Sequence, residues 1–302
     1  CTDADGDNIC DTQLNHTFES QGTNNTDFYP LAKPNLISSC QTLGTANTVY
    51  KLSASVFFYD TCFNITASGV TLDCDGFTVE YANASSGYGV NITGANSTVV
   101  KNCFFLKQNA SVSFSAAIHA TKANNSRFLS NTINSTGNFS NGIQLFTANF
   151  TNITLNTVNV TMNFSYGAVV LLSGGSNLTS NTIITSYGGS GYGINVTQSS
   201  FVILDRNNVT AGLLSGGATN YGIYLFGSSS NTVTANTILT NGTDINYGVF
   251  ISTNSNRNKI SDNTIRTTGS ATGNEGIEIA TTSYYNNVTG NVISTNGTSS
   301  NF

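Results

Sequence analysis

The sequence Asn181-Thr182-Ile183 and its close variants recur at a nearly constant interval, and this repeat decides the fold. Successive copies begin 25 to 29 residues apart. The other copies are Asn102-Cys103-Phe104, Asn131-Thr132-Ile133, Asn156-Thr157-Val158, Asn207-Asn208-Val209, Asn236-Thr237-Ile238, Asn263-Thr264-Ile265 and Asn291-Val292-Ile293. A second marker, in which Gly precedes a branched apolar residue, keeps the same period, as in Tyr221-Gly222-Ile223. Two markers with one period indicate a single repeating structural unit.

Each unit contains short stretches in which apolar and polar residues alternate, separated by clusters of Ser, Asn and Gly. This pattern is typical of half-buried strands joined by tight turns. A unit this short cannot bury its own apolar face, so it must stack on its neighbours. The sequence therefore predicts an all-β fold, a parallel β-helix (solenoid) of roughly nine to ten coils over residues 41–302. A short irregular segment over residues 1–40 would precede the solenoid and cap it.

The first Asn of each copy is predicted to be structural. In stacked coils, equivalent amide side chains repeat at about 4.8 Å and can hydrogen-bond in a ladder. We expect this ladder to include Asn156, Asn181, Asn236 and Asn263, and we expect Ile183, Ile238 and Ile265 to be buried. The residue three positions before this Asn should also lie in the core. If Asp75 and Asn102 occupy the Asn position in the first coils, these core residues include Leu72 and Val99.

Composition limits the partners. The net charge is −5 and charged residues make up 8% of the chain, without a basic patch, so nucleic acid is not expected as a partner. No apolar stretch approaches the length of a membrane span. No signal peptide is recognisable, so we expect a mature or trimmed product.

Twenty Asn-x-Ser/Thr sequons predict N-linked glycans and an extracellular or cell-surface location. A chain rich in Asn, Ser and Thr also produces such sequons by chance. Several of them fall on outward strand positions or stack in columns, which favours glycosylation. The sequon residues are Asn15, Asn24, Asn64, Asn83, Asn91, Asn96, Asn109, Asn124, Asn134, Asn138, Asn149, Asn152, Asn159, Asn163, Asn177, Asn195, Asn208, Asn241, Asn287 and Asn296.

Six cysteines, an even number, indicate an oxidising compartment. Their spacing suggests disulfides between Cys1 and Cys10, between Cys40 and Cys62, and between Cys74 and Cys103. Because six cysteines allow fifteen connectivities, other pairings stay open. Metal binding by these residues is disfavoured because the chain has no Cys-x-x-Cys pair.

The first residues place carboxylates at alternate positions, as calcium-binding loops do. This segment resembles the thrombospondin type 3 calcium repeat. The resemblance implies one structural calcium ion, held by Asp3, Asp5, Asp7 and Asp11 with the backbone carbonyl of Ile9. The departure is Leu14, which stands where a closing acidic residue is expected. The alternative is a solvated acidic turn.

From Cys40 onward, the chain resembles the right-handed parallel β-helix repeat proteins of the pectate-lyase-like superfamily. The opening coils carry the resemblance, in Tyr50-Lys51-Leu52, Cys62-Phe63-Asn64-Ile65-Thr66 and Val70-Thr71-Leu72-Asp73-Cys74-Asp75-Gly76. They look like the first coils of archaeal surface members. The resemblance implies a right-handed coil and leaves function open, because the family contains lyases, hydrolases, epimerases, adhesins and surface proteins.

No catalytic constellation is recognisable. Carboxylates at 73, 75, 205, 262, 275 and 278 are scattered over several coils, and the family's hydrolase signatures are missing. We read Asp73 and Asp75 as turn formers, and Asp205 and Asp262 as surface charges. His119 falls within an expected strand and has no evident catalytic partner. These observations predict that the chain is not an enzyme.

The function predicted first is a structural extracellular glycoprotein, a subunit of a head-to-tail filament or a surface layer. Sequons surround the sides of the rod, whereas uncovered sheet edges at its ends favour self-association end to end. The alternatives are a carbohydrate-active β-helix enzyme, either a polysaccharide lyase or a hydrolase, and a glycan-binding adhesin. Both alternatives make a polysaccharide the partner.

Overall fold

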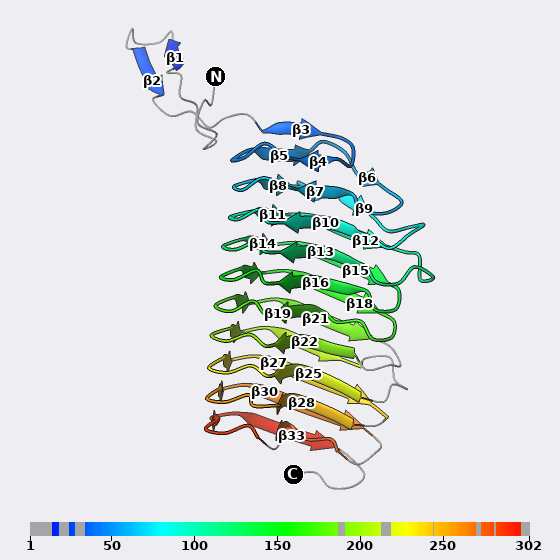
Figure 1. Cartoon of the computed structure of the whole chain (residues 1–302), viewed down its shortest axis with the longest axis vertical. Coiled ribbons are helices and arrows are strands. Elements are labelled where there is room, and N and C mark those ends of the chain that lie inside the picture. Colours follow the sequence, from blue (N-terminus) through cyan, green and yellow to red (C-terminus); the bar gives the residue numbers. More distant parts are fainter. Residues whose placement is uncertain are drawn as a thin grey trace.

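The computed structural model describes residues 34–186, 191–212, 219–243, 245–269, 273–280 and 282–296. It also gives the backbone of an antiparallel pair, β1 (Leu14–Thr17) and β2 (Asn24–Asp27). From residue 34 onward, the chain winds into a stack of coils, one above the other, as Figure 1 shows. No helix in the described ranges is long and apolar enough to cross a membrane.

Each full coil contributes one strand to each of three parallel sheets, named face 1, face 2 and face 3. Face 1 contains β4 (Thr42–Leu43), β7 (Phe63–Ile65), β10 (Tyr88–Thr93), β13 (Ala116–Thr121), β16 (Asn141–Phe146), β19 (Ala168–Leu171), β22 (Gly191–Thr197), β25 (Thr219–Phe226), β28 (Ile245–Ser252) and β31 (Ile277–Ile279). Face 2 contains β3 (Asn35–Ile37), β5 (Val49–Leu52), β8 (Thr71–Asp73), β11 (Val99–Lys101), β14 (Arg127–Leu129), β17 (Asn152–Thr154), β20 (Asn177–Thr179), β23 (Ile203–Asp205), β26 (Thr232–Thr234), β29 (Lys259–Ser261) and β32 (Asn287–Thr289). Face 3 contains β6 (Val56–Phe57), β9 (Thr78–Glu80), β12 (Phe104–Lys107), β15 (Thr132–Thr136), β18 (Thr157–Thr161), β21 (Thr182–Ser186), β24 (Asn208–Ala211), β27 (Thr237–Gly242), β30 (Thr264–Gly269) and β33 (Val292–Asn296).

The all-β parallel solenoid predicted from the repeat is confirmed, with ten or eleven strands in each sheet. Equivalent positions pair in register from coil to coil, as Ile183 pairs with Val209 and Val209 with Ile238. Face 2 already includes β3, which pairs with β5, so described solenoid structure starts before residue 41.

Asparagine side chains at the turn into face 3 form the predicted ladder. The Nδ2 of Asn156 donates to Oδ1 of Asn181 at 3.0 Å, and the Nδ2 of Asn181 donates to Oδ1 of Asn207 at 2.9 Å. The same contact links Asn236 to Asn263. Each amide also accepts a backbone N–H from the preceding coil, so the buried polar groups are satisfied. The expected ladder of Asn156, Asn181, Asn236 and Asn263 is confirmed.

The inward side chains of the strands form one continuous core. Ile183, Ile238 and Ile265 are buried, as predicted. The Gly of the second marker is required by this packing. A Cβ added at Gly222 would overlap Cγ2 of Ile238 and the carbonyl oxygen of Gly248, so this position requires glycine.

The turn before the ladder uses the left-handed backbone region in coil after coil. Leu155, Ser180, Arg206, Ala235 and Asp262 all have φ between 52° and 59°. Such φ values are unfavourable for residues with a Cβ. The ladder amide that follows holds the turn: in Asn181 it bonds the backbone of the preceding coil and the amide side chain of the following coil.

The predicted register is wrong by one residue in one of the early coils. Cys103, rather than Asn102, occupies the ladder position, because its N–H donates to Oδ1 of Asn131. Val100 is therefore the core residue, and Val99, the first residue of β11, is only half-buried. The physical reason is a disulfide between Cys74 and Cys103, which takes the place of the amide ladder between these coils.

The disulfide between Cys40 and Cys62 is also present, so two of the three predicted pairings are confirmed. The third, between Cys1 and Cys10, lies outside the described residues.

Candidate functional site

The residues predicted to bind calcium, Asp3, Asp5, Asp7, Ile9 and Asp11, lie outside the described residues. Within the described ranges, no group of three or more His, Cys, Asp or Glu side chains could hold a metal ion. The calcium site therefore stays a prediction for the N-terminal segment.

Sequon asparagines lie on the outside of the solenoid wherever their side chains are described. Asn15 and Asn24 fall in β1 and β2, where only the backbone is described. Some amide nitrogens, which are the atoms that carry glycans, are engaged. The Nδ2 of Asn91 donates to Asn64, and that of Asn177 donates to Asn152. A glycan at Asn91 or Asn177 would take one of the two Nδ2 hydrogens and leave one donor for these bonds; occupancy stays a prediction.

Of the two residues predicted to form turns, Asp75 lies in the turn after β8, and Asp73 is the last residue of that strand. Asp73 accepts the backbone N–H of Asp75 and pairs with Lys101 at 3.1 Å. Asp75 pairs with Lys51 at 3.1 Å. Burial raises the pKa of Asp73, but its hydrogen bonds and the Lys101 ammonium outweigh this effect, so the net pKa is lowered. Asp73 thus stays ionised and fastens neighbouring turns.

The outward side of face 1 carries a column of aromatic rings. Tyr166, Tyr192, Tyr221 and Tyr247 occupy consecutive coils, and their ring centroids are 5.0, 4.6 and 5.4 Å apart. The rings are stacked, with interplanar angles between 9° and 22°. All four side chains are half-buried. Face 1 therefore presents a regular row of ring edges and hydroxyl groups to solvent.

A second aromatic column lies beside the first one. Tyr224 stacks on Phe250 with centroids 5.2 Å apart, and Phe250 also contacts Tyr221 at 4.9 Å. Burial, followed by the neighbouring Tyr224 and Tyr247, raises the pKa of Tyr221 to about 12. Its phenol therefore stays protonated at physiological pH and can donate a hydrogen bond.

Two carboxylates lie at the C-terminal end of these columns. Glu275 follows Tyr247 in its column, and Glu278 pairs in register with Phe250. Burial, and then the Glu278 carboxylate, raise the pKa of Glu275. Its Oε2 is buried without a hydrogen-bond partner among the described residues.

A groove of about 300 Å³ lies further towards the N-terminus on the same face. One wall is a stack of three phenylalanines, Phe114, Phe139 and Phe164, with centroids 4.9 and 5.0 Å apart. Tyr88 and Tyr166 line it from face 1. The remaining lining residues are Ser115, Asn141 and Gln144. The groove is thus aromatic at its walls and uncharged throughout.

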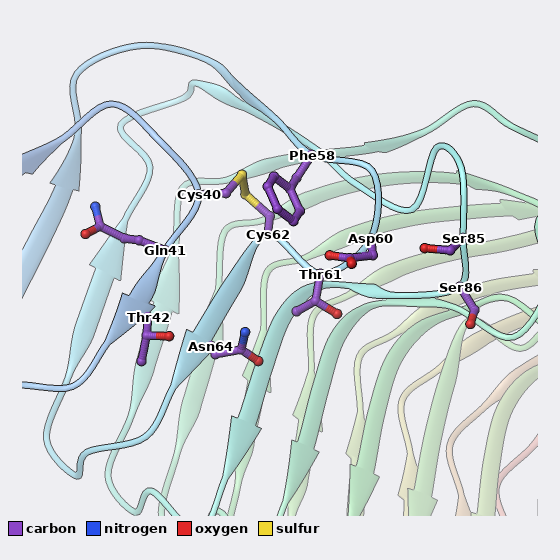
Figure 2. Close-up of a pocket in the computed structure, with 10 residues that line it drawn as sticks. All are labelled: Cys40, Gln41, Thr42, Phe58, Asp60, Thr61, Cys62, Asn64, Ser85 and Ser86. Atoms are coloured by element: carbon purple, nitrogen blue, oxygen red, sulfur yellow. A yellow bond between two sulfur atoms is a disulfide. The ribbon is translucent and has the colours of Figure 1, made fainter.

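Figure 2 shows a second, polar pocket of about 440 Å³ at the start of face 1. The Cys40–Cys62 disulfide and Phe58 lie on one side of it, and Asp60 and Thr61 face it from the following turn. Thr61 lies one coil before Tyr88 at the equivalent position, and the Tyr88 N–H donates to the Thr61 hydroxyl. The pocket, the groove and the tyrosine column therefore form one continuous surface along face 1.

On face 3 the buried residue Lys107 lines a hollow of about 310 Å³. The Nζ of Lys107 donates to the backbone carbonyls of Asn109, Val112 and Thr136 at 2.7, 2.7 and 2.5 Å. Burial lowers the pKa of Lys107 to about 8. These three bonds fasten the loop after β12 to the next coil, so we assign this residue a structural role.

The sequence showed the tyrosines only as part of the repeat marker. Tyr192, Tyr221 and Tyr247 each precede the marker Gly, but the spacing alone does not say that they point outward. Strand alternation could have predicted their outward direction. Strand alternation places the residue before a buried Gly on the outer side, and three successive tyrosines there form an exposed column.

The family comparison agrees with the observed coils. The sequence profile of the family described as "Right handed beta helix region" matches residues 35–209 and 151–301. The chain belongs to this family. The coil is therefore right-handed, as the sequence resemblance implied. No curated protein sequence matches the chain.

Solved structures with this fold include DFA-IIIase from Arthrobacter chlorophenolicus. One, in complex with GF2, has a TM-score of 0.58 and 14% identity, covering 81% of this chain and 61% of that one. A variant in complex with DFA-III has a TM-score of 0.62 and 12% identity, covering 88% and 74%. PfbA, a surface adhesin of Streptococcus pneumoniae, has a TM-score of 0.48 and 12% identity, covering 87% and 82%. The chain thus spans less than two thirds of the DFA-IIIase chain bound to GF2.

The prediction that the chain is not an enzyme is corrected by these findings. DFA-IIIase, an enzyme, shares its fold at TM-scores of 0.58 and 0.62. At 12% to 14% identity, this similarity establishes the fold alone. Scattered carboxylates on such a solenoid therefore give no reason to exclude catalysis.

Proposed function

We propose that this chain is an extracellular glycoprotein that binds a carbohydrate polymer along face 1. The tyrosine column carries this proposal. The exposed edges of the stacked rings offer apolar contact to the C–H groups of sugar rings, and the phenol hydroxyls can bond sugar hydroxyls. A column that repeats at each coil suits a ligand that also repeats. The two disulfides are compatible with an oxidising, extracellular compartment.

The length of this surface supports a polymer rather than a small molecule. Face 1 has ten strands, and the polar pocket, the groove and the tyrosines follow one another along it. At a spacing of about 4.8 Å, ten strands extend over roughly 43 Å. DFA-IIIase, which has a similar fold, has been solved in complex with DFA-III.

Replacing two rings of the column should weaken polymer binding. Tyr192→Asn combined with Tyr221→Asn removes two ring edges from the surface and introduces Asn, which stands at the equivalent position one coil before Tyr166, at Asn141. Loss of two aromatic contacts, each contributing about 1 kcal/mol or more, should lower affinity at least about tenfold. Affinity electrophoresis through gels containing soluble polysaccharides measures the effect.

The control is Phe201→Ala, which removes a ring that is 70% exposed at the turn into face 2. Its affinity should match that of the wild type. If the wild type, the double tyrosine variant and Phe201→Ala were all retarded equally, or if none of them were retarded, the tyrosine column would be ruled out as the binding surface. Polymer length measured in the same mixtures would reveal any turnover.

We also propose that subunits associate end to end, which a specific observation favours. In the last described coil, Val288 and Ile293 are 40% and 45% exposed, whereas their stacking neighbours Ile260 and Ile265 are 0% and 1% exposed. Strands β31, β32 and β33 are the terminal strands of the three sheets. We propose that the β3 end of another copy covers this coil, with sequon glycans discouraging lateral contact.

Ile293→Asp should abolish this association, because a charge would enter an apolar junction. The side chain is already partly exposed, so folding should change little. Thr264→Asp, an exposed position on the side of face 3, is the control. Light scattering and electron microscopy should show rods for the wild type and the control, and single subunits for Ile293→Asp. Dispersed wild-type subunits at high concentration would contradict end-to-end assembly.

A further inference from the structure

The ring column of face 1 is interrupted between Tyr88 and Tyr166. Sheet pairing places Ala116 and then Asn141 on the two intervening coils, in register with Tyr88. Tyr166 follows Asn141 directly, because its backbone N–H donates to Asn141 Oδ1 at 3.1 Å. From Tyr166 to Tyr247 the column continues with a ring on each coil. Two coils therefore contribute no ring of their own to this column.

A neighbouring side chain fills the first of these two vacancies. The ring of His119, from the same strand as Ala116, stacks on Tyr88 with centroids 4.4 Å apart and an interplanar angle of 11°. The second vacancy, at Asn141, has no such ring. Tyr88 and Tyr166 are three strands apart, or about 14 Å, which leaves about 10 Å between His119 and Tyr166. This space is twice the ring spacing of the column, so it accommodates one more ring.

This vacant position opens into the groove described above. Tyr88, Asn141, Gln144 and Tyr166 line the groove from face 1, and the phenylalanine stack encloses it laterally. The stack runs without interruption alongside the vacancy. A ring placed at the Asn141 position would therefore contact aromatic carbon on three sides.

Two amide groups at the vacancy have unused donors. Asn141 Oδ1 accepts from Tyr166, and Gln144 Oε1 accepts from His119 Nδ1 at 3.3 Å. The nitrogens Asn141 Nδ2 and Gln144 Nε2 make no hydrogen bond to any described residue. Aromatic contact on the faces of a ligand ring, with donors at its edge, matches the apolar faces and equatorial hydroxyls of a pyranose.

Because the groove carries no charge, it favours neutral saccharides over acidic ones. None of its eight lining residues is charged. His119 beneath it uses both ring nitrogens, with Nδ1 on Gln144 and Nε2 on Thr121 at 2.9 Å. Burial lowers the pKa of His119, although the Gln144 bond opposes this shift, so the imidazole is neutral at physiological pH. A uronate carboxylate would find no cation here.

We infer that the vacant position at Asn141 binds one pyranose ring of a neutral saccharide, sandwiched between the Tyr88–His119 pair and Tyr166. Asn141 Nδ2 and Gln144 Nε2 donate to its hydroxyls. This inference rests on the proposed function and deepens it, because it names a neutral ligand and the position of one sugar unit.

Asn141→Tyr tests the inference directly. Tyrosine already occupies this column on several coils, so the new ring should fill the vacancy and continue the stack. The probes are maltohexaose and cellohexaose, with hexagalacturonic acid as the acidic counterpart, measured by isothermal titration calorimetry. The wild type should bind a neutral hexasaccharide at least tenfold more tightly than the acidic one. Asn141→Tyr should weaken the neutral complex at least tenfold.

Asn141→Ala serves as the matched control, because it removes one donor while leaving the vacancy open. It should weaken binding less than Asn141→Tyr does, and thermal unfolding should show that both variants fold. Neutral hexasaccharide binding that survives Asn141→Tyr unchanged would overturn the inference. Equal or tighter binding of hexagalacturonic acid, or binding of indole without any saccharide, would also overturn it.

The two proposals fail in different ways. If the Tyr192→Asn, Tyr221→Asn protein loses polymer binding while Asn141→Tyr keeps all of its hexasaccharide affinity, face 1 binds polymer and the vacancy does not bind sugar. If the wild type binds a neutral hexasaccharide and Asn141→Tyr does not, yet no polysaccharide in the gel retards the wild-type protein, the vacancy is a sugar site and the polymer proposal fails.

Discussion

Ile238→Asp should unfold the coils around β27. Ile238 is 1% exposed, and its Cγ2 packs where Gly222 leaves room in face 1. The substitution removes a buried aliphatic side chain and places a carboxylate in the core without a partner. Together these effects should lower the free energy of unfolding by at least about 4 kcal/mol.

Urea unfolding followed by circular dichroism measures the global effect, and hydrogen exchange locates it. Solenoids unfold in parts, since each coil contacts only its neighbours, so exchange should accelerate first around β24, β27 and β30. Thr237→Asp adds the same charge to the exposed outer side of the same strand, and its effect should stay within about 0.5 kcal/mol. Equal stability of the two variants would contradict the register.

Asn181→Ala should be the second most damaging change. Its Nδ2 donates to the Ile153 carbonyl at 2.8 Å and to Asn207, and its Oδ1 accepts from the backbone and side-chain nitrogens of Asn156. Removing the amide leaves several buried polar groups without partners. Each unsatisfied group costs about 1–3 kcal/mol, so a loss of roughly 3–5 kcal/mol is expected.

The comparison is Thr182→Ala, the next residue, whose side chain points outward from β21. It should change the free energy of unfolding by less than about 0.5 kcal/mol. Urea midpoints of the two variants check the difference. If Asn181→Ala were as stable as Thr182→Ala, the ladder would make no net contribution to stability.

The repeat predicted the coil because its period reflects a physical constraint. Each coil must return the chain to the same turn, where one Asn side chain bonds both neighbouring coils. Because of that constraint, Asn recurs once per coil, as at Asn181 and Asn236, and this recurrence is visible in a single sequence. It fails at Asn102, because the Cys74–Cys103 disulfide replaces the amide contact and moves the ladder position by one residue.

The candidate site was less predictable because it depends on which coils lie beside one another. Tyr88, Ala116 and Asn141 align only after the loop lengths between them are known, and those loops vary. The vacancy at Asn141 is thus a property of three coils together. The alternation of the sequence could have placed Tyr221 outward, but the stacking of His119 on Tyr88 is seen only in the three-dimensional structure.

Hydroxyl-radical footprinting of the tyrosines, with and without a bound neutral polysaccharide, tests the central claim most directly. The chain has no Trp, so Tyr and Phe supply the aromatic signal, and the oxidation of each tyrosine is followed separately by peptide mapping. Tyr284 and Tyr285, which are 59% and 82% exposed and lie outside face 1, are internal controls. The account predicts slower oxidation of Tyr166, Tyr192, Tyr221 and Tyr247 in the complex, with Tyr284 and Tyr285 unchanged. Unaltered oxidation of the face 1 tyrosines under saturating polymer would contradict it.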